Sequence, residues 1–164
     1  MTDPTEIGSV RPGESDRTAG RPPQGLGGLL RDRLARQTGR PVELVETHIS
    51  WVLLTGEFAY KIKKPVDLGF VDFSTLELRR HFCAEELRLN RRLAPDLYLD
   101  VVAVRGTPAA PTLGGDGPVL DYAVRMREFP QESLLAREIE RGELSAREVD
   151  ALAAIVAAFH SRIA

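Results

Sequence analysis

Residues 57–65, Glu57-Phe58-Ala59-Tyr60-Lys61-Ile62-Lys63-Lys64-Pro65, contain all three lysines of the 164-residue chain, while the other nineteen of its 22 basic residues are arginines. On a strand, alternation would place Ala59, Lys61 and Lys63 on one face, and Pro65, which has no N–H to donate, would end the strand. A lysine ammonium group is a compact charge that suits phosphate oxygens. The stretch therefore predicts either a phosphate-anchoring strand or a solvated edge strand, on which lysine discourages pairing with other chains.

The segments around this stretch predict an antiparallel sheet. Residues 42–46, 51–55 and 58–64 are rich in β-formers and are joined by short turns, which predicts a three-stranded meander. Two further β-rich segments, residues 98–105 and 119–129, are separated by a proline-rich connection that ends in a glycine-rich turn. We therefore expect an α+β fold with an antiparallel sheet of about five strands.

A long helix is predicted after the lysine strand, from Ser74 to about residue 93. Ser74 is a candidate N-cap, with Glu77 three residues later as its capping-box partner. The half-buried stripe of this helix includes Arg79 and Glu86, whereas Glu85 points about 100° away from it. Because an unpaired carboxylate on a half-buried face is costly, Glu86 is the candidate helix partner for a lysine of the strand. A structural salt bridge would require the same geometry as a functional one.

The two ends of the chain have different patterns. Residues 1–23 are rich in Pro, Gly, Asp, Arg and Ser and predict a disordered tail, and residues 24–39 predict a short amphipathic helix. At the other end, helices are expected over 132–141 and from 146 onward, the second capped by Ser145 and Glu148. Nothing else in the chain obviously covers the apolar stripe of the last helix, which consists of Leu152, Ile155, Val156, Phe159 and Ile163.

Composition excludes several classes of protein. The net charge of -2 and the lack of aromatic residues among the basic ones speak against nucleic-acid binding. No apolar run approaches the roughly 18 residues of a membrane span. The single cysteine, Cys83, fits a reducing cytoplasm, and without a Cys-x-x-Cys motif or clustered histidines a Cys/His metal site is not expected.

Three segments carry a resemblance to a known family: residues 47–56 (THISWVLLTG), 59–66 (AYKIKKPV) and 83–93 (CAEELRLNRRL). They closely resemble the start of the bacterial aminoglycoside-phosphotransferase-like predicted kinases, which are often fused to a C-terminal P-loop ATPase domain. The resemblance covers roughly residues 40–164. It implies a protein-kinase-like fold, with residues 40–130 as the small N-terminal lobe and 131–164 as the truncated start of the large lobe.

The resemblance also implies how the phosphates of a nucleotide would be held. Lys61 best matches the lysine that orients phosphates, with Lys63 the competitor on the same face, and Glu86 matches the glutamate that holds this lysine. The turn from Thr47 to Ser50 matches the phosphate-covering loop. This turn lacks the Gly-x-Gly-x-x-Gly of protein kinases. Without these glycines, its backbone is less able to approach a phosphate group closely.

The adenine ring would be framed by Ala59 and by a hinge from Met126 to Glu128. Because Pro130 has no N–H, the main-chain donor to adenine is expected on Glu128. The implied cofactors are ATP and Mg²⁺, with the metal ligands outside this chain. No catalytic residue is expected here, because the sequence has no H-x-D loop, and the triplet Asp72-Phe73-Ser74 lies before the long helix, as a connector.

Two functions remain open at this point. The chain is either the nucleotide-binding part of a small-molecule kinase, which transfers the γ-phosphoryl group of ATP to a hydroxyl, or a non-catalytic interaction module on a kinase-like scaffold. The expected partners are a nucleotide and either the rest of the large lobe or a protein that covers the last helix, with no membrane and no nucleic acid. The chain alone is expected to bind nucleotide weakly and without turnover.

Overall fold

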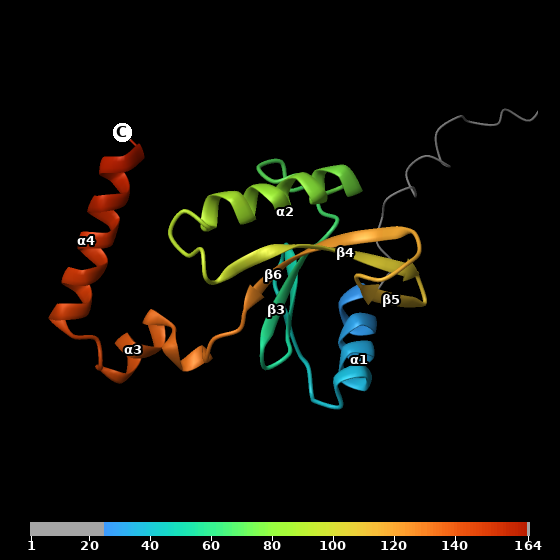
Figure 1. Cartoon of the computed structure of the whole chain (residues 1–164), viewed down its shortest axis with the longest axis horizontal. Coiled ribbons are helices and arrows are strands. Elements are labelled where there is room, and N and C mark those ends of the chain that lie inside the picture. The colour runs from blue at the N-terminus through green and yellow to red at the C-terminus, as the bar shows by residue number, and fades with distance from the viewer. Residues whose placement is uncertain (1–24, 164) are drawn as a thin grey trace, which may run out of the picture.

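A computed structural model describes residues 25–163 (Figure 1). They form an α+β fold with one curled, six-stranded antiparallel sheet. The strands are β1 (Glu43–Glu46), β2 (Ser50–Leu54), β3 (Phe58–Lys63), β4 (Tyr98–Thr107), β5 (Ala110–Leu113) and β6 (Val119–Arg127). The helices are α1 (Leu26–Thr38), α2 (Leu76–Asn90), the short 3-10 helix η1 (Gln131–Ser133), α3 (Leu135–Arg141) and α4 (Ala146–Ile163). The tail predicted over residues 1–23 lies outside the described residues.

Strand β3, which carries Lys61 and Lys63, lies inside the sheet. The strand order is β1-β2-β3-β6-β4-β5. Lys61 is paired with Val52 of β2 on one side and with Val124 of β6 on the other. The predicted meander of β1, β2 and β3 is therefore confirmed. The interpretation of the lysine strand as a solvated edge is wrong, because β3 is paired with a neighbouring strand on both sides.

The sheet has six strands rather than the predicted five, because part of the proline-rich connection forms β5. This strand pairs with the end of β4, from Val104 opposite Leu113 to Thr107 opposite Ala110. It lies at the edge of the sheet, where Pro111 can be accommodated without the loss of a ladder hydrogen bond. Gly106 has a φ of 105°, and a Cβ at this position would lie 2.5 Å from the carbonyl oxygen of Ala110. Only glycine fits this bend.

Helices α1 and α2 cover opposite faces of the sheet (Figure 1). On the α1 face, a buried core comprises Leu26, Leu30, Val42, Leu53, Ile62, Val104 and Ala123. On the other face α2 packs over β6 and β4. Because side chains alternate along β3, Ile62 enters the α1 core while Lys61 and Lys63 point toward α2. The sheet thus separates an apolar core from a charged layer under α2.

The N-cap of α2 is Thr75 rather than the predicted Ser74. The hydroxyl oxygen of Thr75 accepts a hydrogen bond from the Leu78 amide at 3.2 Å, as an N-cap side chain does. Ser74 instead precedes the helix, where its amide donates to Asp72 and its carbonyl accepts from the Arg79 side chain. The predicted capping box with Glu77 is therefore wrong by one position. The helix also ends earlier than predicted, at Asn90.

The segment after β6 runs away from the sheet (Figure 1). Helix α4 comes back to the end of α2, where the Arg92 guanidinium lies 4.7 Å from the centroid of the Phe159 ring. The predicted capping box of α4 is confirmed: the Ser145 amide donates to the Glu148 carboxylate at 2.8 Å, and the Glu148 amide donates to the Ser145 hydroxyl at 3.3 Å. Exposed apolar side chains follow along the helix, including Leu152, Ile155, Val156 and Ile163. Within residues 25–163, no helix has both the length and the apolar character needed to cross a membrane.

Candidate functional site

Two lysines of β3 share one carboxylate of α2. Lys61 Nζ lies 2.9 Å from Glu86 Oε1, and Lys63 Nζ lies 2.6 Å from Glu86 Oε2. The alternation of β3 brings both ammonium groups to the α2 face, and helical spacing places Glu86 on the buried stripe of α2. Sequence reasoning identified all three residues, and the structure brings them together.

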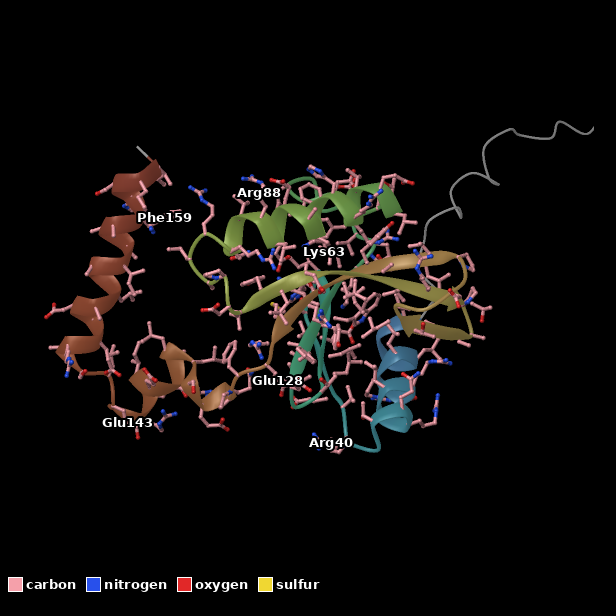
Figure 2. All side chains as sticks on the ribbon, viewed as in Figure 1. Arg40, Lys63, Arg88, Glu128, Glu143 and Phe159 are labelled. Atoms are coloured by element: carbon pink, nitrogen blue, oxygen red, sulfur yellow. The ribbon has the colours of Figure 1, made fainter. Side chains whose placement is uncertain are left out.

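The two lysines differ in their surroundings. The Lys61 side chain is 32% exposed, whereas that of Lys63 is 7% exposed. The ammonium group of Lys63 also lies over the ring of Phe73, 4.8 Å from its centroid, in a cation–π contact. Figure 2 shows Lys63 between α2 and the sheet. Lys61 is therefore the lysine that can reach a molecule in solvent.

The Glu86 carboxylate is held in its charged form. Burial disfavours the charge, but the hydrogen bonds and positive charges of Lys61 and Lys63 outweigh that effect and lower the pKa of Glu86 below its ordinary value. Its neighbour Glu85 lies outside the site, as predicted, and pairs with Arg88 at 2.7 Å. Arg88 projects from the outer side of α2 (Figure 2). The two adjacent glutamates thus have separate partners.

A second ion pair fixes the first half of α2 to the sheet. Arg79 and Asp121 are both fully buried, and Arg79 Nε lies 3.0 and 3.1 Å from the two carboxylate oxygens. Arg79 Nη1 also donates to the carbonyl oxygens of Phe73 and Ser74. Burial raises the pKa of Asp121, although the charge of Arg79 and the amide of Tyr122 oppose this shift. The pair joins α2, the preceding connector and β6 two helical turns before Glu86.

Cys83 lies between these two ion pairs on the buried side of α2. It is fully buried, and its thiol donates to the carbonyl oxygen of Tyr122 at 3.8 Å. Burial raises the pKa of the Cys83 thiol to about 12, so the thiolate that would act as a nucleophile is not populated at neutral pH. Cys83 is a packing residue here.

The expected adenine-framing residues lie at the junction of β3 and β6. Ala59 is buried, and it is paired with Met126 across the two strands. The expectation that Glu128 offers its amide to adenine does not fit this arrangement. The Glu128 amide donates to the carbonyl oxygen of Glu57 at 2.9 Å, and its carboxylate accepts from the Gly56 amide at 2.7 Å. Glu128 thus ties the end of β6 to the β2–β3 turn.

The turn that was matched to a phosphate-covering loop joins β1 to β2, and Ser50 faces inward there. Ser50 is 1% exposed, and within residues 25–163 its hydroxyl has no hydrogen-bond partner. Its amide donates to the hydroxyl of Thr47 at 3.0 Å. Lys64, the third lysine, lies at the same turn and pairs with Glu46 at 2.6 Å. Neither the hydroxyl nor the amide of Ser50 is offered to solvent.

Among the described residues, two of the surface cavities near the sheet are lined by residues other than Lys61 and Glu86. One, of about 380 Å³, lies between the end of α1 and the β3 side chains Phe58 and Tyr60. The other, of about 320 Å³, lies between the β2–β3 turn and residues 128–132. The lysine site is a partly exposed face, because the Lys61 side chain is 32% exposed.

Sequence reasoning missed two residues that matter for the site. Asp121 was not identified, although Arg79 on the predicted buried stripe signalled that a buried carboxylate must lie opposite. Phe73, which is buried and contacts Lys63, was assigned only to a connector. Among the residues that the structure describes, no group of three His, Cys, Asp or Glu side chains is placed to hold a metal ion.

The comparisons with known proteins identify similar sequences of undefined function. No family model matches the sequence, and no solved structure matches it. Proteins of Mycobacterium bovis and of two strains of Mycobacterium tuberculosis, each named only as uncharacterized, are 36% identical to the chain over 121 residues. The match covers 74% of this chain and 23% of each relative. The chain thus spans less than a quarter of the length of the curated relatives it matches.

Proposed function

We propose that this chain is the nucleotide-binding N-terminal part of a small-molecule kinase of the aminoglycoside-phosphotransferase-like type. The observation that carries the proposal is the pair of Lys61, on an internal strand, and Glu86, on the helix that packs over it, 2.9 Å apart. In a kinase-like lobe this pair holds a lysine at the phosphates of ATP. Lys61 keeps a third of its side chain exposed, as such a role requires.

The reaction of the whole protein would be transfer of the γ-phosphoryl group of ATP to a hydroxyl. In this chain the contribution would be binding and orientation: Lys61 contacts phosphate oxygens, Glu86 fixes Lys61, and Ala59 and Met126 flank the base. The Glu128 amide is bonded to the Glu57 carbonyl and is given no adenine contact, and the buried Ser50 hydroxyl is given no phosphate contact. No group of three His, Cys, Asp or Glu side chains among the described residues is placed to hold a metal ion, and no step through Mg²⁺ is assigned to them.

Calorimetric titration with Mg-ATP tests the proposal on the full chain. We expect weak binding that Lys61→Met abolishes while the circular dichroism spectrum stays unchanged. Arg88→Met is the matched control, because it removes an exposed basic side chain from the outer face of α2. Equal affinity of the unaltered chain and Lys61→Met would refute the proposal. Phosphoryl transfer by the chain alone would contradict the proposal that this part of the protein binds the nucleotide without catalysing the reaction.

A second candidate function is a non-catalytic interaction module, which the exposed apolar residues of the C-terminal helices favour. Leu135 and Ile139 on α3 and Leu152, Ile155 and Val156 on α4 are all exposed. Exposed apolar side chains on two successive helices are typical of a face that another protein surface covers. On this alternative, Lys61→Met would change neither nucleotide binding nor folding, whereas polar substitutions on α4 would abolish association with the partner.

A further inference from the structure

The β1–β2 turn, residues 47–49, is held at both of its ends by the third lysine of the chain. Lys64, which directly follows β3, donates its amide to the carbonyl oxygen of Ile49 at 2.8 Å. Its ammonium group donates to the carbonyl oxygen of Thr47 and lies 2.6 Å from the carboxylate of Glu46. The Lys64 side chain is 15% exposed, so these contacts are largely shielded from water.

Trp51 and helix α1 support this arrangement. The Lys64 ammonium group lies 5.5 Å from the centroid of the Trp51 ring in a cation–π contact, and Trp51 Nε1 donates to the Glu46 carboxylate at 3.3 Å. The ring also packs against α1 at Gly27, where a Cβ would lie 2.9 Å from it. Helix α1, which precedes the part of the chain that resembles kinases, thus supports the turn through Trp51.

The contacts of Lys64 and the lysine site lie on opposite faces of the sheet. Trp51 is opposite Ile62 in the β2–β3 ladder. Ile62 belongs to the core under α1, and Trp51 packs against that core. Lys61 points toward α2 instead, because side chains alternate along β3. Lys64 can therefore hold the turn without occupying the space beside Lys61.

The turn lies close to the lysine site along the strands. Ser50, the first residue after the turn, is opposite Lys63, and Val52 is opposite Lys61. Two residues of a strand span about 7 Å, a distance that the phosphate chain of ATP can bridge. A nucleotide bound at Lys61 would therefore come within reach of the turn.

We propose that Lys64 is a positioning residue that holds the β1–β2 turn in place, so that the turn contacts nucleotide phosphates without first having to be ordered. The contact with phosphates rests on the proposed nucleotide binding. The hold of Lys64 on the turn does not, because its contacts are present in the chain without ligand. A turn that is already fixed loses little conformational entropy on binding, which favours affinity. Lys61 stays paired with Glu86 throughout.

Amide exchange followed by NMR tests the hold of Lys64 without any nucleotide. The Thr47 amide donates to the Ser50 carbonyl at 2.9 Å, and the Ser50 amide donates to the Thr47 hydroxyl at 3.0 Å. We expect Lys64→Met to speed the exchange of both amides by about tenfold, because a hydrogen bond from a charged group is lost. Lys64→Arg, which can still donate to Thr47 and Glu46, should restore slow exchange. Unchanged exchange in Lys64→Met would overturn the proposal.

Titration with Mg-ATP separates positioning from a direct contact of Lys64 with phosphate. Glu46→Ala removes the carboxylate that holds Lys64 and should weaken Mg-ATP binding by about threefold. If Lys64 contacted phosphate directly, Glu46→Ala would free the lysine and remove a negative charge, so the anionic nucleotide would bind more tightly. Glu43→Ala is the matched control, because it removes the same charge from the same strand. Binding to Glu46→Ala that is as tight as binding to Glu43→Ala, or tighter, would overturn the proposal.

The variants at position 64 complete the test. Lys64→Met should weaken Mg-ATP binding and Lys64→Arg should restore it, with unchanged circular dichroism spectra. If Lys64→Met does not fold, Glu46→Ala replaces it in the exchange measurement, where faster exchange of the Ser50 amide supports the proposal and unchanged exchange overturns it. Absence of Mg-ATP binding to the unaltered chain would refute the proposed function and the contact with phosphates, while amide exchange would still decide the hold of Lys64.

Discussion

The buried pair of Arg79 and Asp121 gives a prediction whose size follows from the structure. Both side chains are fully buried. Among the described residues, Arg79→Met would leave the Asp121 carboxylate with the Tyr122 amide as its hydrogen-bond donor, and it would remove the donor from the carbonyls of Phe73 and Ser74. Loss of one partner of a buried ion pair costs about 3–5 kcal/mol. Since small domains are stable by only about 5–15 kcal/mol, the variant should be close to unfolding.

Urea unfolding followed by the fluorescence of Trp51, the single tryptophan, measures this cost. Removing both charges in Arg79→Met/Asp121→Leu should cost much less than the sum of the two single variants, because apolar residues of similar volume can replace a buried pair with little loss. The exposed pair provides the control: Arg88→Met should leave the urea midpoint unchanged. A cost below about 1 kcal/mol for Arg79→Met, or additive single variants, would refute the reasoning.

Three further predictions concern the thiol, the pH dependence and α4. Cys83 should resist alkylation at pH 8 in the native chain and react fully in urea, because it is buried and its pKa is raised to about 12; rapid labelling of the native thiol would contradict its burial. Glu86→Gln should lower the free energy of unfolding at neutral pH, and this loss should become smaller as the pH falls below 4.5, the ordinary pKa of a glutamate. The reason is that a carboxylate with a lowered pKa stabilises the folded chain above the ordinary pKa, and this stabilisation is lost as the carboxylate is protonated at lower pH. Glu85→Gln is the matched control in the same urea titrations, and a cost of Glu86→Gln that does not change with pH would count against the pairing. Sedimentation should show self-association of the chain, because burying an exposed isoleucine such as Ile155 in an interface would contribute about 1.5–3 kcal/mol. Ile155→Ser should weaken this association, and a monomer at all concentrations would contradict the prediction.

Much of the site could be predicted from local periodicity. The period of two along residues 59–63 placed Lys61 and Lys63 on one face, and the helical period placed Glu86 rather than Glu85 on the buried stripe. Both assignments need only the position of a residue within its own element. The structure confirms these placements, whereas binding of a nucleotide stays a proposal.

Sequence reasoning missed or misplaced those features that are set by contacts between residues distant in the sequence, or by a choice between two adjacent residues that could fill the same role. Strand β5 was overlooked because prolines normally oppose a strand, and only the edge position of β5 accommodates Pro111. The N-cap was placed at Ser74 because Ser and Thr are nearly equivalent caps, and the bond from Arg79 to the Ser74 carbonyl was not visible in the sequence. The Glu128 amide was expected to be free, but the β2–β3 turn uses it.

The most direct test of the nucleotide-anchoring role uses the three lysines of the chain. With ¹³C at the lysine ε-carbon, the spectrum should contain one signal each for Lys61, Lys63 and Lys64, assigned by single Lys→Met variants. On titration with Mg-ATP, we predict a large shift of the Lys61 signal, a small one for Lys63, which stays on Glu86, and little change for Lys64, which is paired with Glu46. If the Lys61 signal does not move while the nucleotide binds, Lys61 does not anchor the phosphates and the central claim is contradicted.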